Sequence, residues 1–154
     1  MKLQKVDTSI VKATTHEHPV FIDPDTIPWT PWVIEGTSFK LMHLKEDTGG
    51  FTMFLKVEAG NDAPIHGHIG SSEVYIMEGE FGYDDDRGAK GHYGYEPAGA
   101  SHMPTSPGGT IMFAIIHGPL FGYNPDGSIG GIVDGQAMYA MAKENNAHKH
   151  LHLE

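Results

Sequence analysis

Glycine and proline divide this chain into short pieces, and that division constrains its fold more than any other feature. The sequence holds 20 glycines and 10 prolines among its 154 residues. Because both residue types interrupt regular structure and mark turns, their frequency favours short strands over long helices. Between the turns, an apolar side chain recurs at every second residue, as at Phe51, Met53, Leu55 and Val57. This repeat is the period-2 pattern of a half-buried β-strand.

Several further runs predict strands, and one predicts a helix. We expect strands at 32–36, 39–45, 73–78, 80–83, 92–96 and 110–117, with a turn at Gly79 inside a hairpin. The helix is expected over 136–144, because Asp134 is a favourable N-cap residue. Many short strands with a single terminal helix predict an all-β domain built as an antiparallel sandwich or barrel.

The length fits one domain with its own hydrophobic core. Residues 1–30 are expected to form an N-terminal arm packed on the barrel, because their prolines prevent a helix or a central strand. Residues 31–147 form the β domain itself. Residues 148–154 are expected to be a flexible tail.

Charge and composition exclude several classes of function. The formal net charge of -10 argues against non-specific nucleic-acid binding and against attraction to anionic membranes. The chain has no apolar run near the roughly 18 residues that cross a bilayer, and its start lacks the apolar core of a signal peptide. A cytoplasmic location is therefore expected. The absence of cysteine excludes disulfides and thiolate-ligated metals.

The residues that carry chemistry lie in the stretch from His66 to Glu73 and near His102. On an extended strand, residues two apart point the same way, so His66 and His68 aim at one point. Imidazoles and carboxylates are common ligands of divalent metals. We therefore expect a mononuclear metal site at His66, His68 and His102, with Glu73 as a fourth candidate ligand.

Other side chains are assigned by the face they share. Tyr75 and Met77 lie on the face of Glu73, so we expect them to line the barrel interior. Met53, Phe113 and Ile115 are candidates for the same lining.

The roles of three further histidines stay open at this point. His117 follows the face of Phe113 and Ile115 and could reach the pocket. His16 and His18 repeat the spacing of the central pair, but their flanks predict no rigid strand to hold a metal.

Two spaced patterns resemble the motifs of the cupin superfamily. They are Gly60-x5-His66-x-His68-x4-Glu73-x5-Gly79 and Gly91-x5-Pro97-x-Gly99-x2-His102. The resemblance implies a single-domain jelly-roll barrel and a metal bound inside it. Ser106 departs from the asparagine that many second motifs carry there, at a position that is usually not a ligand.

A closer likeness spans most of residues 32–146. Tyr93-Gly-Tyr-Glu96-x5-His102, His117-Gly-Pro-Leu and Asn124-Pro-Asp-Gly, followed by the helix, are similar to the acetylacetone-cleaving and 2,4'-dihydroxyacetophenone dioxygenase-like cupins. That likeness implies Fe(II) on three histidines and cleavage of a C–C bond in a β-diketone or hydroxyketone with O2. Under it, Glu73 is either a ligand or a neighbour of one. Glu96 is then a catalytic candidate that fixes an imidazole tautomer or takes a substrate proton. A homo-oligomer, dimer or tetramer, is also implied.

Two other functions fit the same residues. Mn, Ni or Zn on the four ligands would suit an isomerase or lyase acting on a small polar substrate. A metal-bearing cupin could also bind a small ligand without turnover. Ligand spacing does not distinguish these alternatives, and fold alone does not decide function.

Overall fold

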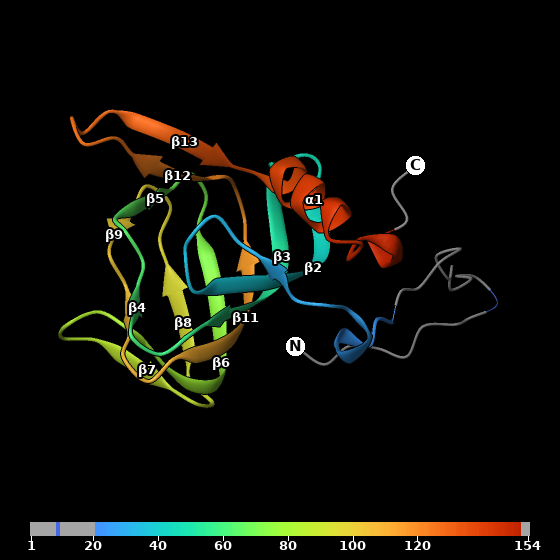
Figure 1. Ribbon diagram of the computed structural model, residues 1–154, viewed down its shortest axis with the longest axis horizontal. Helices are drawn as coiled ribbons and strands as arrows, with labels where there is room; N and C mark the ends of the chain where they lie inside the picture. Colours follow the sequence, from blue (N-terminus) through green and yellow to red (C-terminus); the bar gives the residue numbers. More distant parts are fainter. Residues whose placement is uncertain (1–8, 10–20, 152–154) are drawn as a thin grey trace.

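Three long antiparallel strands form the centre of the fold: β3 (Gly50–Val57), β11 (Thr110–Ile116) and β6 (Ser72–Gly82). They belong to a computed structural model that describes residue 9 and residues 21–151 (Figure 1). Within these residues the main sheet has the order β1-β2-β3-β11-β6-β10-β4, and β7 and β8 also pair with β6. The bounds are β1 (Thr30–Pro31), β2 (Thr37–Lys45), β4 (Asn61–Asp62), β7 (Arg87–Ala89), β8 (Tyr93–Glu96) and β10 (Thr105–Ser106).

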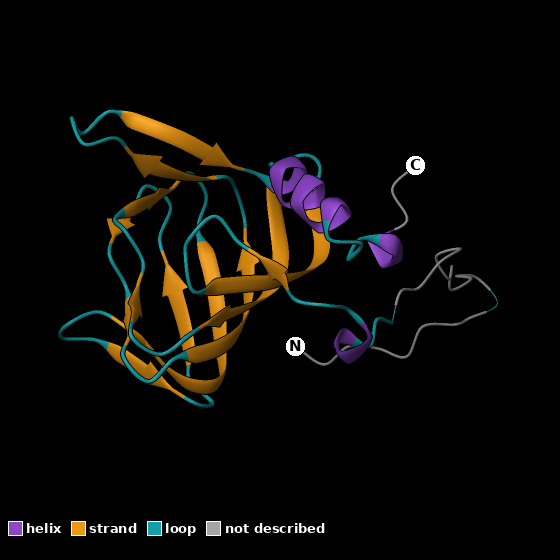
Figure 2. Cartoon of the chain, viewed as in Figure 1, coloured by secondary structure: helices purple, strands orange, loops and turns teal. Residues whose placement is uncertain are grey.

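A smaller sheet closes the other side of the barrel. Its order is β13-β12-β5-β9. The bounds are β5 (His66–His68), β9 (Ser101–His102), β12 (Leu120–Tyr123) and β13 (Ile129–Val133). Figure 2 shows the strands of both sheets curling around a shared interior, with the helix outside that curl. The all-β prediction is therefore confirmed.

The core follows the alternation expected of half-buried strands. In β3, Phe51, Met53 and Leu55 are buried, whereas Thr52 and Phe54 between them are only half-buried. The other fully buried large apolar side chains come from β2, β11 and the helix, at Phe39, Leu41, Met112 and Met138. The interior is therefore closed by side chains from opposite parts of the chain.

Strand β6 differs from the hairpin expected at Gly79. The strand continues to Gly82, pairing with β11 and β8 before Gly79 and with β7 and β10 after it. Gly79 has φ 73°, and a Cβ there would lie 2.0 Å from the carbonyl oxygen of Gly109. Glycine is needed because it alone adopts this left-handed conformation without steric cost. It acts as a bend within a strand rather than as a turn between two.

The segment 32–36 also differs from expectation, because it is a turn and not a strand. The N–H of Trp32 donates to the carbonyl of Thr37, and the N–H of Thr37 donates to that of Ile34. These bonds close a tight connection between β1 and β2, and they bring Trp32 over the barrel interior.

The described part of the N-terminal arm packs on the barrel. It contains a short 3-10 helix, η1 (Pro24–Thr26), and Ile27 joins the hydrophobic core. The Lys40 ammonium donates to the carbonyl of Pro24 at 2.7 Å. The candidate ligands His16 and His18 lie outside the described residues.

The end of the chain differs from the expected tail. Residues Lys149–Leu151 form a second 3-10 helix, η2. The ring of His150 donates through Nε2 to the carbonyl of Leu41 at 2.6 Å, and Leu151 packs against the core. Residues 152–154 lie outside the described part of the chain.

The predicted helix is confirmed as α1 (Gly135–Glu144). The Asp134 carboxylate caps it by accepting from the N–H of Ala137 at 2.8 Å. The helix packs against β2 with Met138 fully buried. Among the described residues, no helix is both long enough and apolar enough to span a bilayer.

The N-cap supplies a direct stability test. Replacing Asp134 by alanine leaves the N–H of Ala137 without its side-chain acceptor, so we expect the free energy of unfolding to fall by about 1 kcal/mol. Urea denaturation followed by circular dichroism measures this change. Asp134→Asn is the matched control and should retain most of the stability. An equal loss in both variants would show that the cap hydrogen bond is not the cause.

Candidate metal centre

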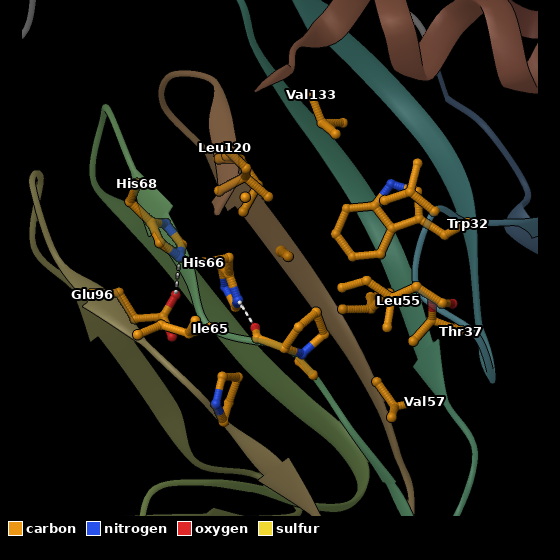
Figure 3. Close-up of a pocket in the computed structure, with 18 of the residues that line it drawn as sticks. Trp32, Thr37, Leu55, Val57, Ile65, His66, His68, Glu96, Leu120 and Val133 are labelled. Atoms are coloured by element: carbon orange, nitrogen blue, oxygen red, sulfur yellow. Dashed lines mark hydrogen bonds and ion pairs between the residues drawn. The ribbon is translucent and has the colours of Figure 1, made fainter. Parts of the chain in front are cut away.

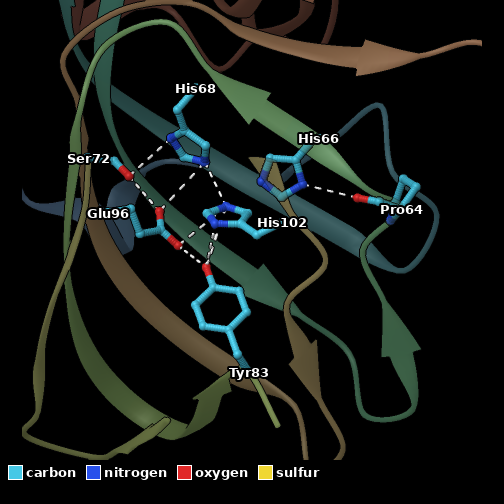
Figure 4. Close-up of polar contacts among 7 residues, drawn as sticks. All are labelled: Pro64, His66, His68, Ser72, Tyr83, Glu96 and His102. Carbon is cyan, nitrogen blue, oxygen red and sulfur yellow. Dashed lines mark hydrogen bonds and ion pairs between the residues drawn. The ribbon is translucent and has the colours of Figure 1, made fainter. Parts of the chain in front are cut away.

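Three imidazoles from two neighbouring strands converge on one point. Strands β5 and β9 are antiparallel, and their register sets His66 opposite His102. The ring centroids of the three pairs of His66, His68 and His102 lie 4.7–5.3 Å apart. One ring nitrogen from each lies within 4.8 Å of the other two, the only such group among the described residues (Figure 4). The sequence-based prediction that these histidines meet is confirmed.

Gly67 allows the two histidines of β5 to sit on a tightly covered strand. A Cβ at this position would lie 2.1 Å from the ring of Phe121, which comes from the paired strand β12. The phenyl ring therefore packs directly on the backbone between His66 and His68. It holds the strand in place without occupying the side where the imidazoles meet.

The outer nitrogen of each ring has its own partner. The Nδ1–H of His66 donates to the carbonyl of Pro64 at 3.1 Å. Nδ1 of His68 lies 3.2 Å from the hydroxyl of Ser72, and Nδ1 of His102 lies 3.0 Å from the hydroxyl of Tyr83. These contacts leave the Nε2 atoms to face one another.

The carboxylate of Glu96 decides the direction of two of these hydrogen bonds. Ser72 donates its hydroxyl proton to Oε2 of Glu96 at 2.5 Å, and Tyr83 donates its own to Oε1. Each hydroxyl group has one proton, which it donates to Glu96. The hydroxyl oxygens of Ser72 and Tyr83 can therefore only accept hydrogen bonds from the histidines. His68 is thus held as its Nδ1–H tautomer. The Tyr83 hydroxyl lies 3.0 Å from Nδ1 of His102 and 3.4 Å from its Nε2, and the shorter contact favours the same tautomer there, with a lone pair on each Nε2.

Burial and neighbouring charge keep the imidazoles neutral and the carboxylate ionised. Burial lowers the pKa of His68 to about 4 and also lowers that of His102, by more than the nearby Glu96 raises them. Burial raises the pKa of Glu96, but hydrogen bonds from Ser72 and Tyr83 and the adjacent imidazoles outweigh it, so the pKa lies below its ordinary value. Burial and the bond to Glu96 raise the pKa of the Tyr83 hydroxyl, which stays protonated.

This donor set fits a divalent cation. Nε2 of His68 and Nε2 of His102 are 2.9 Å apart, although neither carries a proton in these tautomers. Two lone pairs at that separation repel unless a cation lies between them. Neighbouring imidazole ligands at about 2.1 Å from one ion stand about 3 Å apart in octahedral geometry. The three histidines can therefore hold a divalent metal. The negative charge of Glu96 is connected to His68 through Ser72 and to His102 through Tyr83.

Glu73 does not join the histidine cluster. On β6, Ser72 and Val74 point inward and are buried, so Glu73 between them points to the outer face. Its Oε2 accepts from Nε2 of His117 at 2.8 Å, and its Oε1 accepts from the hydroxyl of Tyr93 at 2.8 Å. The hydrogen bonds from His117 and then Tyr93 lower the pKa of the carboxyl. The expected fourth ligand is therefore on the wrong side of the sheet, and so is His117.

The sequence-based expectation that the face of Glu73 points into the barrel was also wrong for other side chains. Tyr75 and Met77 are exposed on the outer face instead of lining the interior. On β11, alternate residues point to opposite faces, and Met112, Ala114 and Ile116 line the pocket. Phe113 and Ile115 therefore face outward. Met53 does line the pocket, as expected. The homo-oligomer expected from the sequence stays a prediction.

Two residues of the site were missed from the sequence. Ser72 precedes Glu73 and shares the inward face of Val74, so a correct choice of face would have identified it. Tyr83 gives no local signal, because it reaches Glu96 only through the bend of β6 at Gly79.

The histidine cluster opens on a largely apolar cavity of about 450 Å³. His66, His68 and Glu96 lie on one side of it, and Trp32, Leu55 and Val133 lie on the other (Figure 3). Such a volume is typical of sites that enclose a small organic molecule. The candidate metal site thus lies at one wall of this cavity.

We expect His102→Ala to abolish metal binding, because two imidazoles alone leave an incomplete ligand set. Elemental analysis of the purified variant should find less than about a tenth of an equivalent. His43→Ala, which removes an exposed histidine on β2, is the matched control and should keep the metal. Equal metal contents in the two variants would contradict the assignment.

The two glutamates give opposite predictions. Glu96→Gln removes the charge that orients Ser72 and Tyr83, so we expect metal affinity to fall by about 10-fold to 100-fold. Glu73→Gln changes only the outer face and should leave affinity unchanged. Competition titration with a metal chelator measures both. Loss of affinity in Glu73→Gln alone would restore Glu73 as the fourth ligand.

Two sequence comparisons relate this chain to known proteins. A family model described as the ChrR cupin-like domain matches residues 17–121. The acetylacetone-cleaving enzyme of Acinetobacter johnsonii is 25% identical over 126 residues, which are 77% of this chain and 82% of that enzyme.

Solved structures support the same fold. The acetylacetone dioxygenase from Acinetobacter johnsonii has a TM-score of 0.72 at 20% identity, covering 86% of this chain and 95% of that one. An RmlC-like cupin protein from Ralstonia eutropha has a TM-score of 0.75 at 24% identity, covering 85% and 89%. The predicted cupin fold is confirmed. Since the family model spans more than half of the sequence, this chain belongs to the ChrR cupin-like domain family of the cupin superfamily.

Proposed function

We propose that this protein is an Fe(II)-dependent dioxygenase that cleaves a C–C bond of a β-diketone or hydroxyketone with O2. The observation that carries the proposal is the three-histidine cluster at the wall of an apolar pocket, with an ionised carboxylate beside it. The similarity to an acetylacetone-cleaving enzyme supports the choice of reaction.

The ligand set suits iron that works with O2. His66, His68 and His102 are neutral donors, so they would leave the full positive charge of a divalent ion and part of its coordination sphere for substrate. When bound, Fe(II) supplies Lewis acidity that favours the enolate of the substrate and an electron source for O2. The metal carries that chemistry, and the chain supplies position and charge.

Glu96 has two tasks in this scheme. Its oxygens lie 3.7 Å from Nε2 of His68 and 3.6 Å from Nε2 of His102, next to the point where the rings converge. It fixes both imidazoles through Ser72 and Tyr83. Because it is ionised, either oxygen can also take the proton that a diketone loses on forming its enolate.

The pocket walls protect the reaction from water. The residues that line the cavity include Val74, Ala114, Ile116 and Leu120, none of which offers a polar side-chain atom. An enolate held there meets O2, which is apolar and enters such a space readily. The reaction consumes one O2 per bond broken and places both oxygen atoms in the products, a carboxylic acid and a second carbonyl compound.

Oxygen uptake tests the proposal. We expect the Fe(II)-loaded protein to consume O2 on addition of β-diketones or hydroxyacetophenones, with about one O2 per substrate cleaved. An oxygen electrode with chromatography of the acid product measures both quantities. The Zn(II)-loaded protein should consume none, because zinc has no redox chemistry.

Matched variants make the result specific. His43→Ala should retain uptake and His102→Ala should lose it. If no diketone or hydroxyketone supports uptake, yet these compounds raise the melting temperature, the dioxygenase proposal fails and a ligand-binding function replaces it.

A further inference from the structure

The cavity is much larger than a minimal diketone requires. Its volume of about 450 Å³ is about three times that of a cavity that holds one benzene molecule. Pentane-2,4-dione is similar to benzene in size, so it would leave about two thirds of the space unfilled. A site built for the smallest substrates would not need the far side of this pocket.

The far side is mostly apolar. Leu55 and Val133 line it together with the indole of Trp32 (Figure 3). The Nε1–H of Trp32 is directed away from the cavity and donates to the sulfur of Met138 at 3.1 Å. Thr37 also lies here, but its hydroxyl is already donated to the carbonyl of Ile34. No free donor on these side chains would recognise a polar group. Asn61 also lines the cavity and packs on Gly36 of the β1–β2 turn, but its amide N–H donates to the carbonyl of Glu58 at 3.2 Å.

Three exposed apolar residues mark the mouth of the cavity, although the exposed Asp62 also lines the cavity. Val33, Ile65 and Ile132 all line the pocket and are nevertheless 59%, 51% and 58% exposed. They come from three separate segments: the β1–β2 turn, the approach to β5, and β13. Single exposed apolar residues are ordinary, but three around one opening form a contact surface for an apolar ligand.

We propose that the substrate carries a long hydrocarbon arm, alkyl or aryl, on the carbonyl group that meets the histidine cluster. The arm lies between Leu55, Val133 and Trp32 and reaches the mouth. This inference rests on the proposed function, because it places the reacting carbonyl at the metal. It deepens that function by excluding short, polar diketones as the preferred substrates.

The chain contains its own reporter of ligand binding. It has two tryptophans, Trp29 and Trp32, and only Trp32 lines the cavity. Trp29 lies outside it under the ammonium of Lys40, 4.7 Å from the ring centre. Trp29→Phe keeps an aromatic ring at that contact and leaves Trp32 as the single tryptophan, so selectively excited tryptophan fluorescence reports on occupation of the far side.

The experiment compares chain lengths in the Zn(II)-loaded Trp29→Phe protein, which binds without turnover. We expect Kd to fall about fourfold for each added methylene, or roughly 200-fold from pentane-2,4-dione to nonane-2,4-dione. Quenching or a shift of Trp32 emission measures Kd. A change of less than about threefold across the series would overturn the inference.

Two substitutions test where the arm lies. Leu55→Phe and Val133→Phe each narrow the far side, so we expect about a tenfold weaker binding of nonane-2,4-dione and little change for pentane-2,4-dione. Val133 is on an edge strand and only half-buried, so its variant provides the test if Leu55→Phe does not fold. Equal effects on both ligands in the folded variants would contradict the placement.

The outcomes separate this inference from the proposed function. Binding that strengthens with chain length, without O2 uptake by the Fe(II) form, supports the hydrophobic arm and rejects the dioxygenase. Uptake that is equally efficient with pentane-2,4-dione and nonane-2,4-dione supports the dioxygenase and rejects the arm.

Discussion

The carboxylate of Glu96 is the group on which the rest of the site depends. It accepts hydrogen bonds from the hydroxyl groups of Ser72 and Tyr83. Because these hydroxyl protons point to Glu96, the hydroxyl oxygens must accept from His68 and His102. Without it, each hydroxyl could turn and donate to its histidine, and the ring nitrogen that faces the metal position would then carry the proton. A buried charge is costly in free energy unless it is fully hydrogen-bonded, and here the same bonds that stabilise the charge also prepare the ligands.

The barrel is built so that these partners can meet. Ser72 starts strand β6 and Tyr83 follows its end, so a straight strand would hold them about 35 Å apart. Their hydroxyl groups nevertheless meet at one carboxylate because β6 curls around the barrel and bends at Gly79. Glu96 lies opposite Ser72 on the neighbouring strand β8, so the sheet register supplies the third partner. The bend, more than any single contact, brings the chemistry together.

The pocket separates two kinds of environment. Ionisable and hydrogen-bonding groups gather at the wall formed by β5, β8 and β9, whereas the opposite wall presents Leu55, Val133 and the indole of Trp32 (Figures 3 and 4). A ligand with one polar end and one apolar end therefore has only one favourable orientation. In the proposed reaction, this orientation would place the reacting atoms without a specific hydrogen bond to every part of the substrate.

The sequence by itself determined the strand periodicity, the helix cap at Asp134, and the three histidines, because each depends on local spacing. His66 and His68 are two residues apart on one strand, and His102 belongs to a recognisable second motif. Only the tertiary structure decided which face of β6 points into the barrel. Either face of an alternating strand could be the buried one, and a one-residue shift moves every side chain to the opposite face. That choice moved Glu73 to the outer surface and brought in Ser72 instead. Tyr83 could not be identified from local spacing because it reaches Glu96, on another strand, only through the bend of β6 at Gly79.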